Sequence, residues 1–184
     1  MDKKITHKIL LKFEKSKIFK FIFYISLSWL YAICSQIIIP LPFNSIPISL
    51  QPLPLFLLSL TIGWPAVYAY FLTIFQTALG APFFSGFQGG TIKLLGPTGG
   101  YIFGFAFAMI FLASIKKYKN DSFVFIFLKL LASNIIIYSF GIIQLSYFVP
   151  KEKLYLLGLT PFIFGDLIKA FIVCSVILRY NLKK

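Results

Sequence analysis

Acidic residues are scarce in this 184-residue chain, with five Asp and Glu against 18 Lys and Arg, and charged residues make up only 12% of it. A soluble domain carries about 25% charged residues. No charged residue lies between Phe21 and Ile92, and 59% of the chain is hydrophobic. The scarcity of charge excludes a soluble domain, and the high hydrophobicity excludes a disordered chain. The composition indicates an integral membrane protein.

Histidine and cysteine are also nearly absent. The single histidine, His7, lies in the basic N-terminal segment, and Cys34 and Cys174 lie inside apolar runs. A zinc site needs a cluster of such ligands, and a serine-type triad needs a histidine beside its nucleophile. The glycines around Gly96 do not form a P-loop, because Pro97 occupies the position of its lysine. We therefore predict no metal site, no cofactor and no enzymatic activity.

Six apolar segments follow the N-terminus, and we expect each to be a membrane-crossing α-helix. Their approximate bounds are 18–39, 48–62, 65–79, 98–115, 122–148 and 161–180. The second and third are short for a crossing of about 20 residues, so we expect them to be tilted or shielded by neighbours. The Pro-rich residues 40–54 and the Gly-rich residues 80–100 are either external loops or the lining of a cavity. The chain is thus predicted to be all-α, with a basic cytoplasmic segment 1–17 and one six-helix membrane domain 18–184.

The distribution of lysine and arginine predicts the orientation of these segments. With the N-terminus in the cytoplasm, the inner side holds Lys3, Lys4, Lys8, Lys12, Lys15, Lys17, Lys20, Lys116, Lys117, Lys119, Arg179, Lys183 and Lys184. The outer side then holds only Lys93, Lys151 and Lys153. Because cytoplasmic loops carry the excess of lysine and arginine, we predict both termini in the cytoplasm. We therefore explain the net charge of +13 by the orientation of the chain in the membrane, and we do not predict nucleic-acid binding.

Asp166 and Lys169 stand out as the only opposite charges that their spacing places together within an apolar segment. At i and i+3 they project from one face of a helix. Each would cost about 2.5–3.5 kcal/mol at the centre of a lipid-facing helix. One interpretation is a structural ion pair at the membrane interface, and the other is a pair that lines a polar cavity. In a cavity, an accepting carboxylate and a donating ammonium suit a small neutral polar group such as a cyclic urea.

Three further polar residues lie near the proposed cavity or within apolar runs. Gln51 follows the Pro-rich stretch, at the predicted mouth of the cavity. Gln76 is interpreted as a hydrogen-bonding link between two membrane helices. Lys93 faces outward beside the cavity, and it competes with Lys169 as the partner of a ligand carboxylate.

Small residues recur at a spacing of four at two places. On the first segment, Ser28 and Ala32 form a surface on which another membrane helix can pack. Gly96, Gly100 and Gly104 have the same spacing at the start of the fourth segment. We interpret these glycines as sites of close helix packing, which is compatible with a backbone that lines a ligand site.

Four blocks of sequence occur in a fixed order over about residues 28–175. They are Ile39-Pro40-Leu41-Pro42-Phe43 with Ile46-Pro47-Ile48-Ser49-Leu50-Gln51, Gly80-Ala81-Pro82-Phe83-Phe84-Ser85-Gly86, Leu95-Gly96-Pro97-Thr98-Gly99-Gly100-Tyr101, and the ending from Gly158 to Lys169. Together these blocks resemble the motifs of the biotin transporter BioY family. The chain departs from them at Ser49, where the family has Thr, and at Ala81, where it has Leu. Ser28 likewise replaces a first Ala in the small-residue pair.

The resemblance implies a multi-pass S component, the substrate-capture subunit of an energy-coupling-factor transporter, in the bacterial cytoplasmic (inner) membrane. It implies high-affinity binding and uptake of biotin, with a membrane-embedded coupling (T) subunit and two ABC-type ATPases as partners. With the outward-facing lysine included, the predicted substrate-binding residues are Asp166, Lys169, Gln51, Phe84, Gly86, Lys93, Thr98 and Tyr101. The predicted interface for the coupling subunit is Ser28 and Ala32. The alternatives are an S component for another vitamin or a biotin precursor, and a scaffold subunit that binds no ligand.

Overall fold

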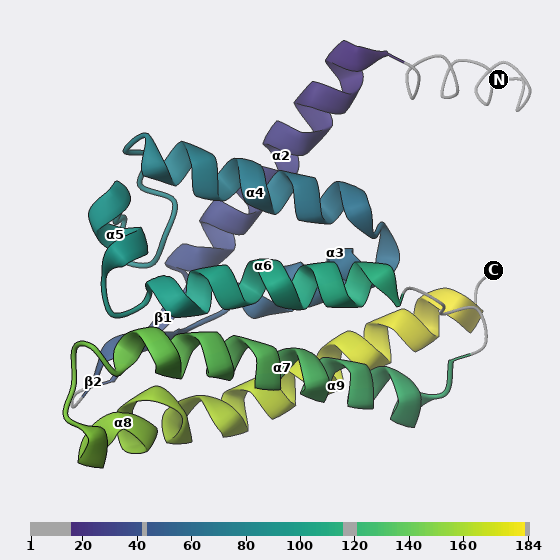
Figure 1. Ribbon diagram of the computed structural model, residues 1–184. Helices are drawn as coiled ribbons and strands as arrows, with labels where there is room; N and C mark the ends of the chain where they lie inside the picture. The colour runs from purple at the N-terminus through teal and green to yellow at the C-terminus, as the bar shows by residue number, and fades with distance from the viewer. Residues whose placement is uncertain (1–15, 42–43, 116–120, 183–184) are drawn as a thin grey trace, which may run out of the picture.

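The computed structural model describes residues 16–41, 44–115 and 121–182 of the chain, which are mainly helical (Figure 1). The helices are α2 (Lys17–Gln36), α3 (Pro52–Thr61), α4 (Trp64–Ala78), α5 (Thr91–Leu95), α6 (Gly99–Ser114), α7 (Phe123–Leu145), α8 (Lys151–Gly158) and α9 (Thr160–Leu182), and the strands β1 (Ile38–Leu41) and β2 (Asn44–Ser49) form an antiparallel hairpin. The six longer helices correspond to the six predicted segments, whereas α5 and α8 are short helices within the connections. Most of the predicted N-terminal segment 1–17 lies outside the described residues.

Three stretches of the described residues are long and apolar enough to cross a membrane. They are α2, α7 and the stretch Lys151–Arg179, which joins α8 to α9. Helices α3 and α6 are apolar but shorter. At a rise of 1.5 Å per residue, the ten residues of α3 span about 15 Å, half of the hydrocarbon core. Helix α3 packs against α4, α6 and α9, so its short length is shielded by protein, which is one of the two predicted alternatives.

The first helix ends three residues earlier than predicted. Helix α2 stops at Gln36, and the next residues form β1, in which Ile38 pairs with Ser49 and Ile39 pairs with Ile48 of β2. The cause lies in the local sequence, because β-branched isoleucines favour extended backbone and Pro40 disfavours the helical conformation at the residue before it. The Pro-rich stretch is therefore a β-hairpin that leads directly into α3.

Helix α6 occupies the centre of the molecule, with α4 on one side and α7 on the other (Figure 1). Two of its glycines allow a close approach to α7. A Cβ atom added at Gly100 would lie 2.8 Å from Cβ of Gln144, and one at Gly104 would lie 2.9 Å from Cα of Ile137. The predicted close packing is confirmed at these two positions. Gly96 does not take part in this helix contact, because it caps the end of α5 instead.

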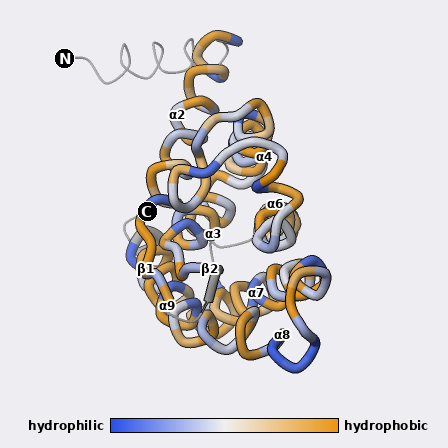
Figure 2. Tube along the Cα trace, turned by 90° about the vertical axis from the view of Figure 1, so that its left-hand side faces the viewer, coloured by the Kyte–Doolittle hydropathy of each residue, from blue (hydrophilic) through white to orange (hydrophobic). Residues whose placement is uncertain are grey.

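Several of the connections lie at one end of the helices (Figure 1). The hairpin β1–β2, α5 and α8 lie together at this end, whereas the beginning of α2 and the end of α9 lie towards the other (Figure 1). Figure 2 looks onto the end that carries the hairpin. A strongly hydrophilic stretch lies at the beginning of α8, whereas the long helices are coloured mainly as hydrophobic (Figure 2).

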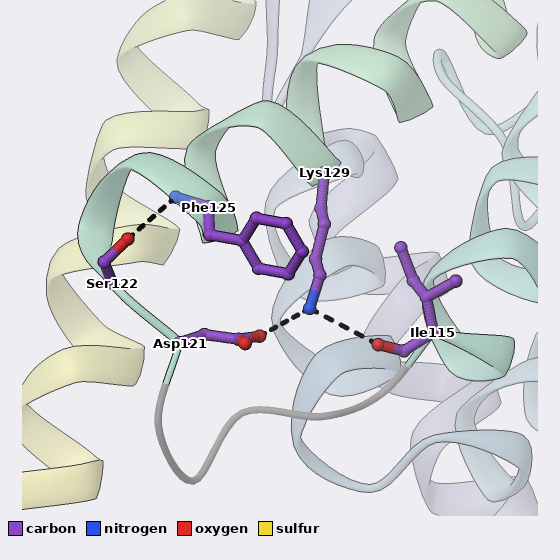
Figure 3. Close-up of polar contacts among 5 residues, drawn as sticks. All are labelled: Ile115, Asp121, Ser122, Phe125 and Lys129. Carbon is purple, nitrogen blue, oxygen red and sulfur yellow. Dashed lines mark hydrogen bonds and ion pairs between the residues drawn. The ribbon is translucent and has the colours of Figure 1, made fainter.

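A second buried ion pair lies at the beginning of α7 (Figure 3). The ammonium of Lys129 pairs with the carboxylate of Asp121, donates a hydrogen bond of 3.3 Å to the carbonyl oxygen of Ile115, and lies 4.5 Å from the ring centroid of Phe125. The sequence reading that Asp166 and Lys169 form the only such pair is therefore wrong. Asp121 precedes the helix, so helical spacing does not reveal that Lys129 reaches back to it.

Candidate binding site

A cavity opens at the end of the molecule that carries the hairpin, and segments from most of the chain contribute to its wall. It is lined by Pro47, Ser49, Gln51, Pro52, Phe84, Ser85, Lys93, Thr98, Tyr101, Ile102, Phe105, Ile137, Tyr138, Phe162, Asp166 and Lys169. The space between these side chains, with its open mouth, is about 600 Å³. The Pro-rich residues 40–54 and the Gly-rich residues 80–100 thus contribute to a cavity wall. Of the two interpretations, external loops or the lining of a cavity, the structure favours the lining of a cavity.

Asp166 and Lys169 form the charged part of this wall. Nζ of Lys169 donates a hydrogen bond of 2.8 Å to Oδ1 of Asp166, and the two residues are 8% and 7% exposed. They are at once a buried ion pair and part of the cavity lining. An ammonium carries three donors, and each carboxylate oxygen carries two acceptor sites. The pair therefore retains capacity to bond a polar ligand.

Tyr138 completes this group and was not predicted. Its hydroxyl, on α7, donates a hydrogen bond of 2.6 Å to Oδ2 of Asp166 on α9. Both oxygens of the carboxylate thus accept a hydrogen bond, Oδ1 from Lys169 and Oδ2 from Tyr138. These two bonds fix the orientation of the carboxylate group. The only sequence signal is a tyrosine within the apolar run of α7, and nothing in that run indicates that it meets Asp166.

Gln51 presents an unmatched hydrogen-bond donor. The side chain is 3% exposed and lines the cavity, and its Nε2 has no hydrogen-bond partner among the described residues. A buried donor without a partner costs about 1–3 kcal/mol. A ligand oxygen in the cavity would satisfy this donor. The amide therefore points to a ligand that carries an acceptor.

Lys93 brings a second positive charge to the cavity, from α5. Its Nζ donates hydrogen bonds to Oε1 of Gln88 at 2.8 Å and to Oγ of Ser85 at 3.5 Å. Among the described residues no carboxylate forms an ion pair with it. Burial lowers the pKa of Lys93 from its ordinary value of 10.5, because desolvation disfavours the charged form. An anionic ligand group would offset this cost, which makes Lys93 the natural partner for a carboxylate.

The remaining predicted residues take different places. Phe84 is 2% exposed and lines the cavity, as does Tyr101, whose hydroxyl donates a hydrogen bond of 2.6 Å to the carbonyl oxygen of Gly158. Tyr101 therefore offers its ring to a ligand, because its hydroxyl is already used. Thr98 lines the cavity without capping α6 through its side chain. Gly86 is not among the lining residues, and it lies at φ 75° in the turn that follows Phe84.

The small-residue pair of α2 is buried inside the chain. Ser28 is 0% and Ala32 is 7% exposed, and α2 packs on α4 along this face. The hydroxyl of Ser28 donates to Oε1 of Gln76 at 2.5 Å and accepts from Oγ1 of Thr73 at 3.0 Å. In this structure the chain's own helix α4 covers Ser28 and Ala32, and their contact with a separate subunit stays a prediction. The interpretation of Gln76 as a link between helices is confirmed.

Comparison with known proteins agrees with this arrangement. A family model described as the BioY family matches residues 7–183. The chain belongs to the BioY family. The biotin transporter BioY of Thermotoga maritima is 35% identical over 146 residues, which cover 77% of this chain and 84% of that protein. The probable biotin transporter BioY of Pyrococcus horikoshii is 37% identical over 127 residues, which cover 68% of this chain and 74% of that protein.

A solved structure shares the fold with this BioY family member. The crystal structure of an S-component for biotin from an ECF-type ABC transporter has a TM-score of 0.77 and 23% identity, over 90% of this chain and 92% of that one. The predicted family resemblance is confirmed. Of the predicted fold, the mainly helical architecture is confirmed, with three stretches long and apolar enough to cross a membrane, whereas the β1–β2 hairpin departs from the all-α prediction. The relatives are named as transporters, which agrees with the prediction that the chain is not an enzyme.

Proposed function

We propose that this chain is the biotin-binding S component of a transporter that imports biotin with an ATP-driven energy-coupling module. The observation that carries the proposal is the composition of the cavity. Its wall combines the Tyr138–Asp166–Lys169 group with two donors at Gln51 and Lys93. Within the part of the chain that the structure describes, the amide nitrogen of Gln51 has no partner and Lys93 pairs with no carboxylate. Biotin offers matching groups, namely a cyclic urea with donors and an acceptor, an apolar body and a carboxylate.

The arrangement supports one way to hold biotin. The urea N–H groups would donate to the carboxylate of Asp166, and the urea oxygen would accept from Nε2 of Gln51 or from Nζ of Lys169. The carboxylate would pair with Lys93, because the ammonium of Lys169 already bonds Asp166. The aromatic side chains of the lining would cover the apolar ring and chain. The cavity thus supports the substrate-binding role of every predicted residue except Gly86.

The membrane arrangement follows from the same proposal. The six longer helices would cross the bacterial cytoplasmic membrane with both termini inside. In support, the hairpin, α5 and α8 lie at one end of the molecule, and the beginning of α2 and the end of α9 lie towards the other (Figure 1). The chain carries no nucleotide-binding motif, so the energy would come from a membrane-embedded coupling subunit and two ABC-type ATPases.

Isothermal titration of the purified chain with biotin tests the proposal. We expect saturable binding of one biotin, and competition by dethiobiotin distinguishes biotin from a precursor as the preferred ligand. A chain that is folded by circular dichroism but binds neither compound would contradict the proposal and would favour a scaffold subunit.

A further inference from the structure

A tight turn supplies part of the cavity wall and is held by a side chain from a distant helix. Phe84 and Ser85 line the cavity, and the turn closes on itself through two backbone hydrogen bonds of 3.1 Å between Phe84 and Gln88. Within the turn, Phe87 has φ 54° and is the only described non-glycine residue with positive φ. Backbone in this region is strained for a phenylalanine, and such strain persists only where the surroundings enforce it.

The turn is hydrogen-bonded by the side chain of Gln36, the last residue of α2. Its Oε1 accepts a hydrogen bond of 2.9 Å from the backbone N–H of Phe87. Its Nε2 donates to the carbonyl oxygen of Phe84 at 3.1 Å and to Oγ of Ser35 at 3.0 Å. Ser35 in turn donates a hydrogen bond of 2.6 Å to the carbonyl oxygen of Phe83. One carboxamide therefore bonds the backbone at both ends of the turn.

We infer that Gln36 is a positioning residue of the ligand site, which holds the Phe84 wall of the cavity in place by clamping the strained turn. Gln36 itself does not line the cavity, so it acts through the turn and not on the ligand. The turn also carries the hydrogen-bond partners of Lys93, namely Ser85 and Gln88. Loss of the clamp would therefore displace an apolar wall and the contacts of a cavity lysine together.

The effect on the ligand is expected mainly in its dissociation rate. The inference rests on the proposed function wherever biotin is the probe. In Gln36→Met the side chain keeps its length and loses its hydrogen bonds to the turn, and we expect biotin to dissociate about tenfold faster. Gln36→Glu keeps the acceptor for Phe87 but places a carboxylate oxygen against the carbonyl oxygen of Phe84, so biotin should also dissociate faster than from the wild type. The matched control is Ser26→Ala, which removes an exposed hydrogen bond within the same helix and should leave the rate unchanged.

A second measurement reports on the turn without biotin. Trp29 of α2 packs edge-on against Phe83, with ring centroids 5.5 Å apart. The chain has two tryptophans, so Trp64→Phe leaves Trp29 as the single tryptophan, whose emission is excited selectively over that of tyrosine. In this background, Gln36→Met should make Trp29 more accessible to acrylamide quenching, whereas Ser26→Ala should not. Adding Phe87→Gly to Gln36→Met should partly restore the quenching of Trp29 seen without the Gln36 substitution, because glycine removes the strain that the clamp opposes.

The two measurements separate the possible failures. If the wild type binds no biotin, the proposed function fails, and the quenching of Trp29 still decides whether Gln36 holds the turn. Equal quenching in Gln36→Met and Ser26→Ala overturns the inference. So does a changed quenching with an unchanged biotin dissociation rate, because Gln36 would then hold the turn without positioning the site.

Discussion

Two buried lysine–aspartate pairs lie towards opposite ends of the α7–α9 helix pair, and their surroundings differ. At the beginning of α7, Lys129 is enclosed by Asp121, the carbonyl oxygen of Ile115 and the ring of Phe125 (Figure 3). On α9, the pair of Asp166 and Lys169 lines the cavity. The same two residue types therefore have different surroundings. The ammonium and carboxylate of the first pair face other protein groups, whereas those of the second pair face the cavity.

The pair at α7 ties a connection to a helix. Asp121 precedes α7 and Ile115 follows α6, so Lys129 joins the end of one helix to the approach of the next (Figure 3). The pair at α9 instead leaves bonding capacity towards a cavity, with Tyr138 fixing its carboxylate. Variants of the first pair should therefore change stability, and variants of the second should change ligand binding.

The largest expected effect is the loss of stability in Lys129→Met. Removal of one partner leaves the Asp121 carboxylate, which is 13% exposed, without its counter-charge. Breaking a buried pair costs about 3–5 kcal/mol, and we expect the lower end of this range because water reaches part of Asp121. Thermal unfolding in detergent measures the change, and Lys153→Met, on the exposed part of α8, is the control for the lost charge. Biotin affinity should remain within twofold of the wild type.

The second effect is a loss of binding in Asp166→Asn. The amide offers one acceptor oxygen and no charge, so binding should weaken by about 1.5–3 kcal/mol, the contribution of a hydrogen bond to a charged group. Calorimetric titration with biotin measures it. The matched variant is Asp121→Asn, which makes the same chemical change at the other pair and should leave the affinity unaltered. Equal affinities in both variants would mean that the two pairs have the same, purely structural, role.

A smaller effect is expected for Tyr138→Phe. This variant keeps the ring and removes the hydroxyl that holds Oδ2 of Asp166, while Lys169 still holds Oδ1. We expect biotin to bind about fivefold more weakly, because the carboxylate loses part of its fixed orientation. Tyr155→Phe, on the exposed part of α8, is the control. An unchanged affinity would show that Lys169 alone orients the carboxylate.

The sequence predicts the parts of this comparison that depend on local spacing. The apolar runs predict the six longer helices, and the i, i+3 spacing predicts that Asp166 meets Lys169. Contacts between distant segments leave no such signal, which is why Tyr138 and Asp121 were missed. The end of α2 was misplaced for a different reason, because hydrophobicity does not distinguish a buried helix from a strand of isoleucines. Ser28 and Ala32 show the same limit, since small-residue spacing predicts a packing surface but not the helix that occupies it.

The smallest predicted effect concerns Gln51, which lines the cavity, in comparison with Gln144, which bonds only protein groups. The change in the free energy of unfolding should differ in sign between their methionine variants. Gln51→Met removes the amide whose Nε2 has no partner among the described residues, so the free energy of unfolding should stay equal or rise by up to about 1 kcal/mol. The same variant should weaken biotin binding, because the ligand oxygen loses its donor. Gln144→Met is the matched control, because that amide donates to the carbonyl oxygens of Leu94 at 3.1 Å and Gly96 at 2.7 Å. Its loss should lower stability. A Gln51→Met variant that loses stability with unchanged affinity would show that the amide serves the protein and not the ligand.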